Sequence, residues 1–567
     1  MSWKGAVIFD LYGVIFKRPA GGISNYVKEL GLPQYFLENV FASAEKPGDS
    51  FFRLERGEIS VTQFCDQFER RCQTYAKQVD FKLPSSFSAQ KLYFNFSHTF
   101  PDEEMLNAVA ILKEKGIKIC LLTNNFVDDT SYRGVSAQKF LPLRLIFDEI
   151  IESCRMGIRK PNPEIFLEAC RKLQAKPNET VFLDDLRENV KAARTLGMKT
   201  ILVKSSNQAL RELKLMTGID VFKKAMPVCI DPTKMSQCSI TTKSSIKHHF
   251  FEMGQGPPII LLHGFPEGWY GWRRQIPALV MSGYRVIAME MKGYGESSCP
   301  PEVSEYSIEN ITKQACQSFA LSSSKANSVL GNDILTEIKF KEMCLHKYFV
   351  LGLPQATFIG HDWGGHVAGS LALHYPERTF AVGSFNAPLD LTREDQNALT
   401  TLGQNPAGRA FLDYFQNKDL LSEFSGRLDS QIDSNRDGIS LDWPNDLPNR
   451  TVYSAEELDY VLERMKISGI RGMLNWYRNA NANQRWYSKV AGRQILCPAL
   501  MVTSNSRDTL LTPQLGQHME ERIPNLTKGI LQSGHWVLLE KPVEANEILI
   551  NWLNKVHRNK FQLPSLL

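Results

Sequence analysis

The stretch Gly360-His361-Asp362-Trp363-Gly364-Gly365 follows the apolar run Ala356 to Ile359. This order predicts a buried strand, a sharp turn and a helix, with the side chain of Asp362 held above the end of a sheet. Small residues around Asp362 allow a strained backbone. An ionised carboxylate needs no base to act as a nucleophile and suits displacement at saturated carbon, which indicates opening of a C–O or C–X bond. The alternative is an acidic turn residue that only favours the helix N-terminus.

Two further residues, much later in the chain, complete a catalytic set around Asp362. Asp508 follows the strand pattern Ala499 to Thr503, and His535 lies in a short turn after a later strand pattern. A histidine oriented by an acid activates water against a covalent ester. We therefore assign Asp362 as nucleophile, Asp508 as orienting acid and His535 as base.

The loop after the strand pattern Ile259 to Leu262 reads His263-Gly264-Phe265-Pro266. Together with the turn at Asp362, this loop resembles the α/β-hydrolases, which take one oxyanion-hole N–H from this loop and the other from the residue after the nucleophile. The resemblance implies Phe265 and Trp363 as the two donors. A cis Phe265–Pro266 bond would aim the first donor inward.

Helical patterns and aromatic residues from about 392 to 490 predict a cap between nucleophile and acid. The stretch Leu474 to Asn479 matches the cap motif of the soluble epoxide hydrolases, and the whole set of motifs resembles that family. The resemblance implies that Tyr477 protonates the epoxide oxygen as the ring opens. The family's second cap tyrosine corresponds to Phe411, so ring opening rests on Tyr477 unless Tyr414 contacts the substrate in that role.

The N-terminal half places polar residues after strand patterns or in turns at four points, which are Asp10, Thr123-Asn124, Lys160 and Asp184-Asp185. Their order resembles the haloacid dehalogenase-like phosphatases, in which an aspartate attacks a phosphoryl group. Clustered carboxylates are also the ligand type that Mg²⁺ requires. The resemblance implies Asp10 as nucleophile, Thr123 and Asn124 as phosphate contacts, Lys160 as charge clamp, and Asp10, Tyr12, Asp184 and Asp185 as the Mg²⁺ site, Tyr12 through its backbone carbonyl.

One residue departs from the phosphatase pattern. Tyr12 stands where the family has a second aspartate, which serves as acid and base. A phenol, with an ordinary pKa near 10, is a poor base at neutral pH. We therefore expect a magnesium-dependent phosphatase for lipid phosphates that is impaired by Tyr12.

Length and composition agree with two domains of the α/β class. The chain has 567 residues, which is longer than a single hydrophobic core usually organises. Of these residues 43% are hydrophobic and 22% charged, an ordinary globular composition. We expect a haloacid dehalogenase-like domain with a helical cap at 1–224, a linker at 225–245 and an α/β-hydrolase domain with a helical cap at 246–567. An insertion at about 312–341 precedes the nucleophile.

Charge and cysteine usage exclude several classes of partner. The net charge is +5 without long basic blocks, which argues against nucleic acid, and no run is long enough to span a bilayer. Eleven cysteines without a framework fit a reducing compartment. The final residues lack the basic residue of a peroxisomal signal, so we expect the cytoplasm. The family resemblance implies a homodimer and no cofactor for the hydrolase domain.

The main hypothesis is an epoxide hydrolase that converts lipophilic epoxides, epoxy fatty acids by resemblance, to vicinal diols through an aspartyl ester. A haloalkane dehalogenase would use the same Asp–His–acid set, but it usually has a polar halide-binding group where Phe265 stands. Tyr12, Phe411 and the insertion suggest a third hypothesis, a catalytically weakened scaffold.

Overall fold

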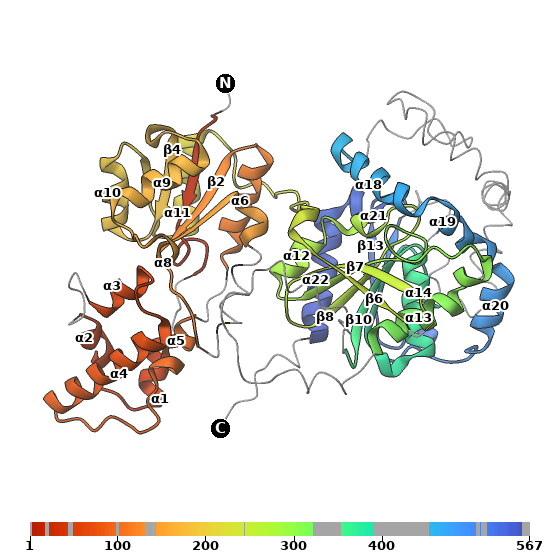
Figure 1. Ribbon diagram of the computed structural model, residues 1–567, viewed down its shortest axis with the longest axis horizontal. Coiled ribbons are helices and arrows are strands. Elements are labelled where there is room, and N and C mark those ends of the chain that lie inside the picture. The colour runs from red at the N-terminus through yellow and green to blue at the C-terminus, as the bar shows by residue number, and fades with distance from the viewer. Residues whose placement is uncertain are drawn as a thin grey trace. The chain divides into compact units, whose positions relative to one another are not determined.

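The structure is a computed structural model of the 567-residue chain. It describes residues 3–17, 22–33, 35–42, 49–97, 101–130, 143–242, 244–320, 353–390, 453–505 and 519–557, with positions 133, 140 and 511. Contacts divide the chain into two units, Met1–Val228 and Cys229–Leu567, and each unit has its own sheet (Figure 1). None of the described helices is long and apolar enough to cross a membrane.

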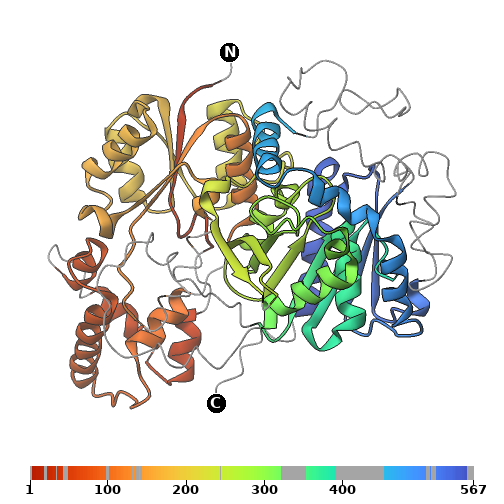
Figure 2. The ribbon, with the colours of Figure 1, turned by 45° about the vertical axis from the view of Figure 1, so that its right-hand side comes forward.

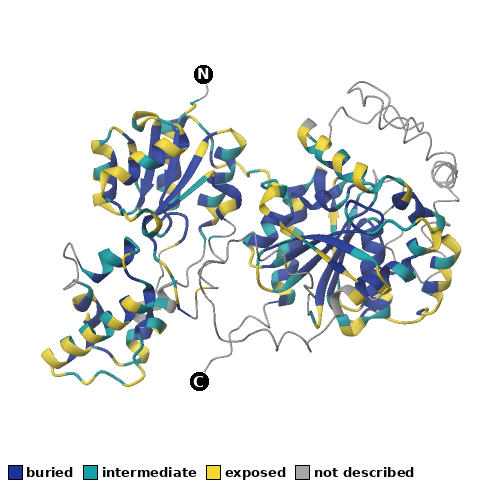
Figure 3. Cartoon of the chain, viewed as in Figure 1, coloured by how far each residue is buried: buried dark blue, intermediate teal, exposed yellow. Residues whose placement is uncertain are grey.

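The first unit contains a parallel five-stranded sheet in the order β3-β2-β1-β4-β5. β1, β2 and β4 are apolar and almost completely buried, as expected for a parallel sheet with helices on both faces (Figure 3). The elements of this sheet and its helices are β1 (Ala6–Phe9), α6 (Glu103–Glu114), β2 (Lys118–Thr123), β3 (Glu149–Glu152), α8 (Ser153–Met156), α9 (Pro163–Leu173), β4 (Thr180–Asp184), α10 (Arg187–Thr195), β5 (Lys199–Leu202) and α11 (Ser206–Thr217).

Five further helices follow β1 and form the helical cap of this unit. They enclose an apolar core that includes Phe36, Phe64 and Phe68. The longest helix, α4, begins with a capping box in which Ser60 and Gln63 each satisfy the other's backbone N–H. The cap consists of α1 (Gly22–Glu29), α2 (Phe36–Ala42), α3 (Ser50–Glu55), α4 (Val61–Gln78) and α5 (Ala89–Ser97).

The second unit contains an eight-stranded sheet in the order β13-β12-β11-β10-β8-β9-β7-β6. Its strands are parallel except for the antiparallel pairs β6–β7 and β7–β9. The strands are β6 (Ser236–Thr241), β7 (Lys247–Met253), β8 (Pro258–Leu262), β9 (Arg285–Glu290), β10 (Ala356–His361), β11 (Thr379–Phe385), β12 (Ala499–Ser504) and β13 (Leu526–Leu531).

Helices cover both faces of this sheet (Figure 2). Ile260 and Phe358 belong to a core shared with α13, α14 and the short helices between residues 471 and 488. Ile359 points to the opposite face of the sheet, towards Trp552 of α22. The helices and turns are α12 (Ile276–Met281), η4 (Val303–Tyr306), α13 (Ile308–Ala320), α14 (Trp363–His374), α18 (Ala455–Ser468), α19 (Arg471–Asn475), η9 (Trp476–Arg478), α20 (Ala480–Ser488), α21 (Val537–Glu540) and α22 (Pro542–His557).

Two sequence expectations differ from the observed elements. The segment 225–245, expected to be a linker, contains β6, which pairs with β7 at the sheet edge. Within β6, Ile240 is the only buried residue, so the strand has almost no apolar alternation to detect. The insertion expected at 312–341 begins inside α13, where Ile311 and Ala315 continue the buried helical face. Positions 321–341 lie outside the described residues.

Candidate active sites

The turn between β10 and α14 has the strained backbone expected for a nucleophile on a sharp elbow. Asp362 has φ of 52° and ψ of −122°, a conformation that L residues rarely adopt. The turn is also tightly packed, because a Cβ atom on Gly364 would lie 2.0 Å from the carbonyl oxygen of Leu262. This geometry holds the Asp362 side chain at the carboxyl end of the central strand β10.

The carboxylate of Asp362 contacts two residues that sequence motifs assign to the same site. The backbone N–H of Phe265 donates to Oδ1 over 3.0 Å, and Nε2 of His535 lies 3.8 Å from Oδ2. The Phe265–Pro266 bond is cis. Asp362 is the N-cap residue of α14 but makes no side-chain hydrogen bond to that helix, whereas its carboxylate accepts the N–H of Phe265. Trp363 is the first residue of α14, where backbone N–H groups have no partner within the helix.

A buried polar chain supports His535 from behind. Nε2 of His361 lies 2.9 Å from the carbonyl oxygen of His535, and Nδ2 of Asn386 donates to the same oxygen over 2.8 Å. Nδ1 of His361 lies 2.5 Å from Oε1 of Glu267. Burial opposes a charge on His361, yet the Glu267 carboxylate outweighs it and raises the pKa of His361 above its ordinary value. These hydrogen bonds therefore fix the backbone that carries His535.

Tyr477 faces this site from the cap. Its ring meets the rings of Trp363 and Phe265 edge to face, with centroids 5.1 and 5.4 Å apart. Burial raises the pKa of the Tyr477 phenol well above its ordinary value, and the charge of Asp362 adds to the effect. A phenol in this environment remains protonated and can serve as a proton donor.

Three sequence assignments in the hydrolase domain fall on positions without a described structure. Asp508, the orienting acid, and Tyr414, the second substrate contact, lie outside the described residues, as does Phe411. Their roles stay predictions from the sequence.

The second site lies at the carboxyl ends of adjacent strands in the first unit. Asp10 follows β1, and Asp184 ends β4. Nζ of the fully buried Lys160 lies between the two carboxylates, 2.6 Å from Oδ1 of Asp10 and 2.7 Å from Oδ2 of Asp184. Asn189, from α10, donates to both carboxylate oxygens of Asp184 over 3.1 Å. The two aspartates and Lys160 therefore form one buried charge cluster.

The residues present fit a divalent cation that prefers oxygen ligands. Carboxylate oxygens of Asp10, Asp184 and Asp185 all lie within 4.8 Å of one another. Hard oxygen donors in this number suit Mg²⁺. Burial raises the pKa of Asp10 to about 7, with a smaller contribution from the charge of Asp184. A bound cation would favour the ionised form of Asp10.

The other three residues assigned to the phosphatase site, Thr123, Asn124 and Tyr12, have different surroundings. Thr123 is buried at the end of β2, beside β1. Asn124 uses both ends of its amide on the backbone of Lys160, accepting from its N–H over 2.9 Å and donating to its carbonyl over 3.1 Å. Its side chain thus positions Lys160. The Tyr12 ring lies 6.3 Å from that of Phe16, and burial raises the pKa of Tyr12 to about 12.

Sequence reasoning missed Glu267, Asn386 and Asn189 as parts of the two sites. Glu267 and Asn386 follow buried parallel strands within a few residues, which is the signal that could have found them. Asn189 lies inside a helix, where a single polar residue on a buried face has no comparable signal.

Comparisons with known proteins agree with this two-site arrangement. Residues 4–197 match the haloacid dehalogenase-like hydrolase family, and residues 257–542 match the alpha/beta hydrolase fold family. Bifunctional epoxide hydrolase 2 from Sus scrofa is 39% identical over 575 residues, covering 98% of both chains. This chain belongs to the bifunctional epoxide hydrolase family.

Other relatives repeat the pattern for all or part of the chain. Bifunctional epoxide hydrolase 2 from Rattus norvegicus is 37% identical and again covers 98% of both chains. The crystal structure of epoxide hydrolase A from Mycobacterium thermoresistibile is 29% identical, with a TM-score of 0.44, and covers 56% of this chain and 98% of its own. The two family matches and the full-length relatives give both halves of the chain a counterpart, and the two-domain α/β fold class is confirmed.

Proposed function

We propose that the C-terminal unit hydrolyses lipophilic epoxides to vicinal diols through an ester on Asp362. The observation that carries this proposal is the convergence of three groups on Asp362. An N–H donor, an imidazole and a buried phenol, from Phe265, His535 and Tyr477, surround its carboxylate. The aromatic walls provided by Phe265 and Trp363 favour an apolar substrate.

The first chemical step opens the ring. Oδ2 of Asp362 attacks an epoxide carbon, the C–O bond breaks, and the oxygen takes the phenolic proton of Tyr477. Oδ1 is the atom bonded to the N–H of Phe265, so it becomes the carbonyl oxygen of the ester. The substrate is then bound covalently through Oδ2.

The second step releases the diol. His535 removes a proton from water, the resulting hydroxide attacks the ester carbon, and the N–H groups of Phe265 and Trp363 stabilise the negative charge on Oδ1. Collapse of the tetrahedral intermediate breaks the bond between the carboxyl carbon and Oδ2, and the departing oxygen takes the proton of the new carboxyl group, which frees the diol and leaves Asp362 ionised. The proton on His535 returns to the phenolate of Tyr477, which restores the starting state.

Adduct analysis tests this mechanism. Asp362→Asn should abolish diol formation, because an amide is a far poorer nucleophile. His535→Gln should allow ring opening but stall hydrolysis, so mass spectrometry should find a substrate-sized adduct on the peptide containing Asp362. A parallel halide-release assay with a haloalkane distinguishes an epoxide hydrolase from a haloalkane dehalogenase. An unmodified peptide from folded His535→Gln protein would reject the ester mechanism.

We further propose that the N-terminal unit is a magnesium-dependent phosphatase for lipid phosphates, and that Tyr12 weakens it. Asp10 is the nucleophile towards phosphorus, and Lys160 and the bound Mg²⁺ offset the phosphate charge. The carboxylates of Asp10, Asp184 and Asp185 and the backbone carbonyl of Tyr12 would hold the cation. Tyr12 has no carboxylate to accept a proton from water, so hydrolysis of the phosphorylated Asp10 lags.

Restoring the carboxylate tests this second proposal. Tyr12→Asp should raise turnover of phosphomonoesters, because a correctly placed general acid–base contributes about 10²–10⁴-fold. Calorimetry should detect Mg²⁺ binding in both proteins and its loss in Asp184→Asn. Strong phosphatase activity in the unsubstituted chain, abolished by Asp10→Asn, would show that Tyr12 is not limiting.

A further inference from the structure

The segment that carries Tyr477 lies along a loop of the catalytic core. We call residues 471–488 the docking segment, which contains α19, η9 and α20, and residues 292–308 the support loop, which follows β9 and ends at the start of α13. Four residues of the docking segment contact the support loop, and their spacing of 4, 3 and 4 is that of a single helical face. They are Gly472, Trp476, Asn479 and Asn483.

The first two contacts bring the backbones together. A Cβ atom on Gly472 would lie 2.7 Å from Cα of Gly293, and one on Gly293 would lie 2.8 Å from the carbonyl carbon of Gly472. Larger side chains at either position must push the segments apart. Four residues on, Nε1 of Trp476 donates to the carbonyl oxygen of Lys292 over 3.0 Å.

Two buried asparagines extend the contact with opposite requirements. Nδ2 of Asn479 donates to the carbonyl oxygens of Val303, over 2.8 Å, and Asn475, over 2.9 Å. Oδ1 of Asn483 instead accepts the N–H of Ile308 over 2.9 Å. Position 479 therefore requires a donor, whereas position 483 requires an acceptor.

The support loop is itself cross-linked. The buried ammonium of Lys292 donates to the carbonyl and carboxylate oxygens of Glu305 over 2.8 and 2.9 Å, which joins the beginning of the loop to its end. The hydroxyl of Tyr306 donates to the carbonyl of Pro300 over 2.8 Å. These bonds restrain the conformation of the loop that the docking segment contacts.

We propose that Gly472, Trp476 and Asn479 are positioning residues for ring opening. Tyr477 directly follows Trp476, and its ring contacts Phe265 and Trp363 beside Asp362. The four contacting residues of the docking segment form what we call the docking face. Through this face the support loop sets the position of the Tyr477 phenol relative to the epoxide oxygen. This inference rests on the proposed role of Tyr477 as proton donor. It assigns to the support loop a function in the first step alone, because ester hydrolysis depends on His535.

The test makes the same substitution at two positions of the docking face. Asn479→Asp keeps the side-chain shape but loses the donor, whereas Asn483→Asp keeps the accepting oxygen, at the N-terminus of α13 where a negative charge is favourable. Both substitutions bury a carboxylate, so Asn483→Asp controls for charge. Ester formation on Asp362 is followed by rapid quench and mass spectrometry, and ester decay is followed after removal of the epoxide.

Asn479→Asp should slow ester formation roughly 10- to 100-fold, because small displacements of a reacting group carry penalties of this order. Ester decay should be unchanged, and Asn483→Asp should leave both steps within about twofold of the unsubstituted protein. Combined with Tyr477→Phe, Asn479→Asp should add no further loss, since the donor that it positions is already absent. A general structural disturbance would slow both steps and add to the effect of Tyr477→Phe.

Four outcomes would overturn the inference. An Asn479→Asp protein with normal ester formation rejects it while leaving the proposed function intact. Equal losses in Asn479→Asp and Asn483→Asp, or additive losses with Tyr477→Phe, also reject it. No ester in the unsubstituted chain rejects the inference and the proposed function together. If Asn479→Asp does not fold, Trp476→Phe, which removes the donor to Lys292, is measured in its place with the same expected result.

Discussion

Asp10 and Asp362 are both carboxylates at the ends of buried strands, yet their surroundings suit them to different electrophiles. Asp10 lies against the ammonium of Lys160 and within reach of two more carboxylates, an arrangement for a cation and a phosphoryl group. Asp362 has an N–H donor and an imidazole, and the walls around it are aromatic. In the proposed mechanisms, neighbouring residues, more than the carboxylate itself, decide which bond each aspartate attacks.

The pair Glu267–His361 gives a pH prediction at the same scale. Burial opposes a charge on Glu267, but His361 outweighs it and lowers the pKa of Glu267, while the pKa of His361 is raised. The raised histidine stabilises the fold fully below its unfolded pKa of about 6.5, and this stabilisation disappears as pH rises through the folded pKa. The lowered carboxylate stabilises above about pH 4.3 and loses its effect as pH falls through its folded pKa.

Glu267→Gln should therefore reduce the free energy of unfolding most between about pH 4.5 and 6.5, and less at pH 9. Denaturant unfolding of both proteins at several pH values measures the difference. His248→Gln is a contrasting comparison, because burial lowers the pKa of His248 to about 4 and its removal should relieve a destabilisation that grows as pH falls from about 6.5 towards 4. A Glu267→Gln effect that is the same at every pH would contradict the ion pair.

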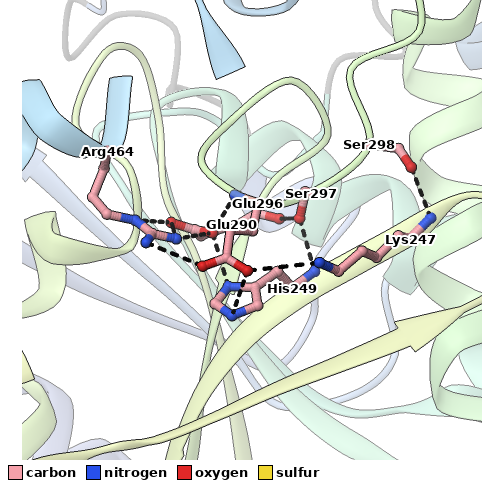
Figure 4. A network of polar contacts seen from close by, with 7 residues as sticks. All are labelled: Lys247, His249, Glu290, Glu296, Ser297, Ser298 and Arg464. Carbon is pink, nitrogen blue, oxygen red and sulfur yellow. Dashed lines mark hydrogen bonds and ion pairs between the residues drawn. The ribbon is translucent and has the colours of Figure 1, made fainter. Parts of the chain in front are cut away.

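At the level of single elements, two Arg–Glu pairs hold α18 to the rest of the second unit. The helix supplies the glutamate of one pair and the arginine of the other. Glu457 on the helix binds Arg273, with Nε to Oε1 at 2.8 Å, and one heptad later Arg464 binds both oxygens of the buried Glu290 at 2.7 Å. His249 lies 2.8 Å from the same carboxylate (Figure 4). Burial opposes ionisation of Glu290, but His249 and Arg464 lower its pKa.

Arg464→Met should destabilise the second unit by about 3 kcal/mol, because it leaves the buried charge of Glu290 without its guanidinium partner. Lys466→Met is the matched control on the same helix. Its exposed pair with Glu463 should contribute less than about 1 kcal/mol. Urea unfolding followed by circular dichroism distinguishes the two, and equal effects would mean that the Arg464 contact contributes no more than a surface pair.

The whole molecule consists of two units with separate sheets and separate cores. Contacts within each unit account for the geometry of its site, so substitutions in one unit should act independently of those in the other. The homodimer expected from the family resemblance stays a prediction.

Asp10→Asn should abolish phosphatase turnover and leave the kcat/KM of diol formation within about twofold. Asp362→Asn should abolish diol formation and leave Mg²⁺ binding unchanged. Enzyme assays and calorimetry on the full chain measure both. A tenfold change in the activity of the unsubstituted unit would reveal coupling between the two active sites.

The sequence by itself determined the two α/β domains, the strand–turn–helix at Asp362 and the strand-end positions of Asp10, Asp184 and His535. These features follow from local patterns, since a buried strand followed by a polar residue is visible within ten residues. Edge strand β6 was mistaken for a linker because its alternation is mostly polar. The expected start of the insertion at 312 lies inside α13, which continues to Ala320.

Only the tertiary structure decided which distant residues meet. Glu267 and His361 are 94 positions apart, Asp10 and Lys160 are 150 apart, and Glu290 and Arg464 are 174 apart. Asn124 is another such case, because its amide binds the backbone of Lys160, 36 positions away; its role as a phosphate contact stays a prediction. Local periodicity records which face of an element is buried. The partner on that face depends on how the strands are ordered and how the loops close, and a single sequence carries no local signal for either.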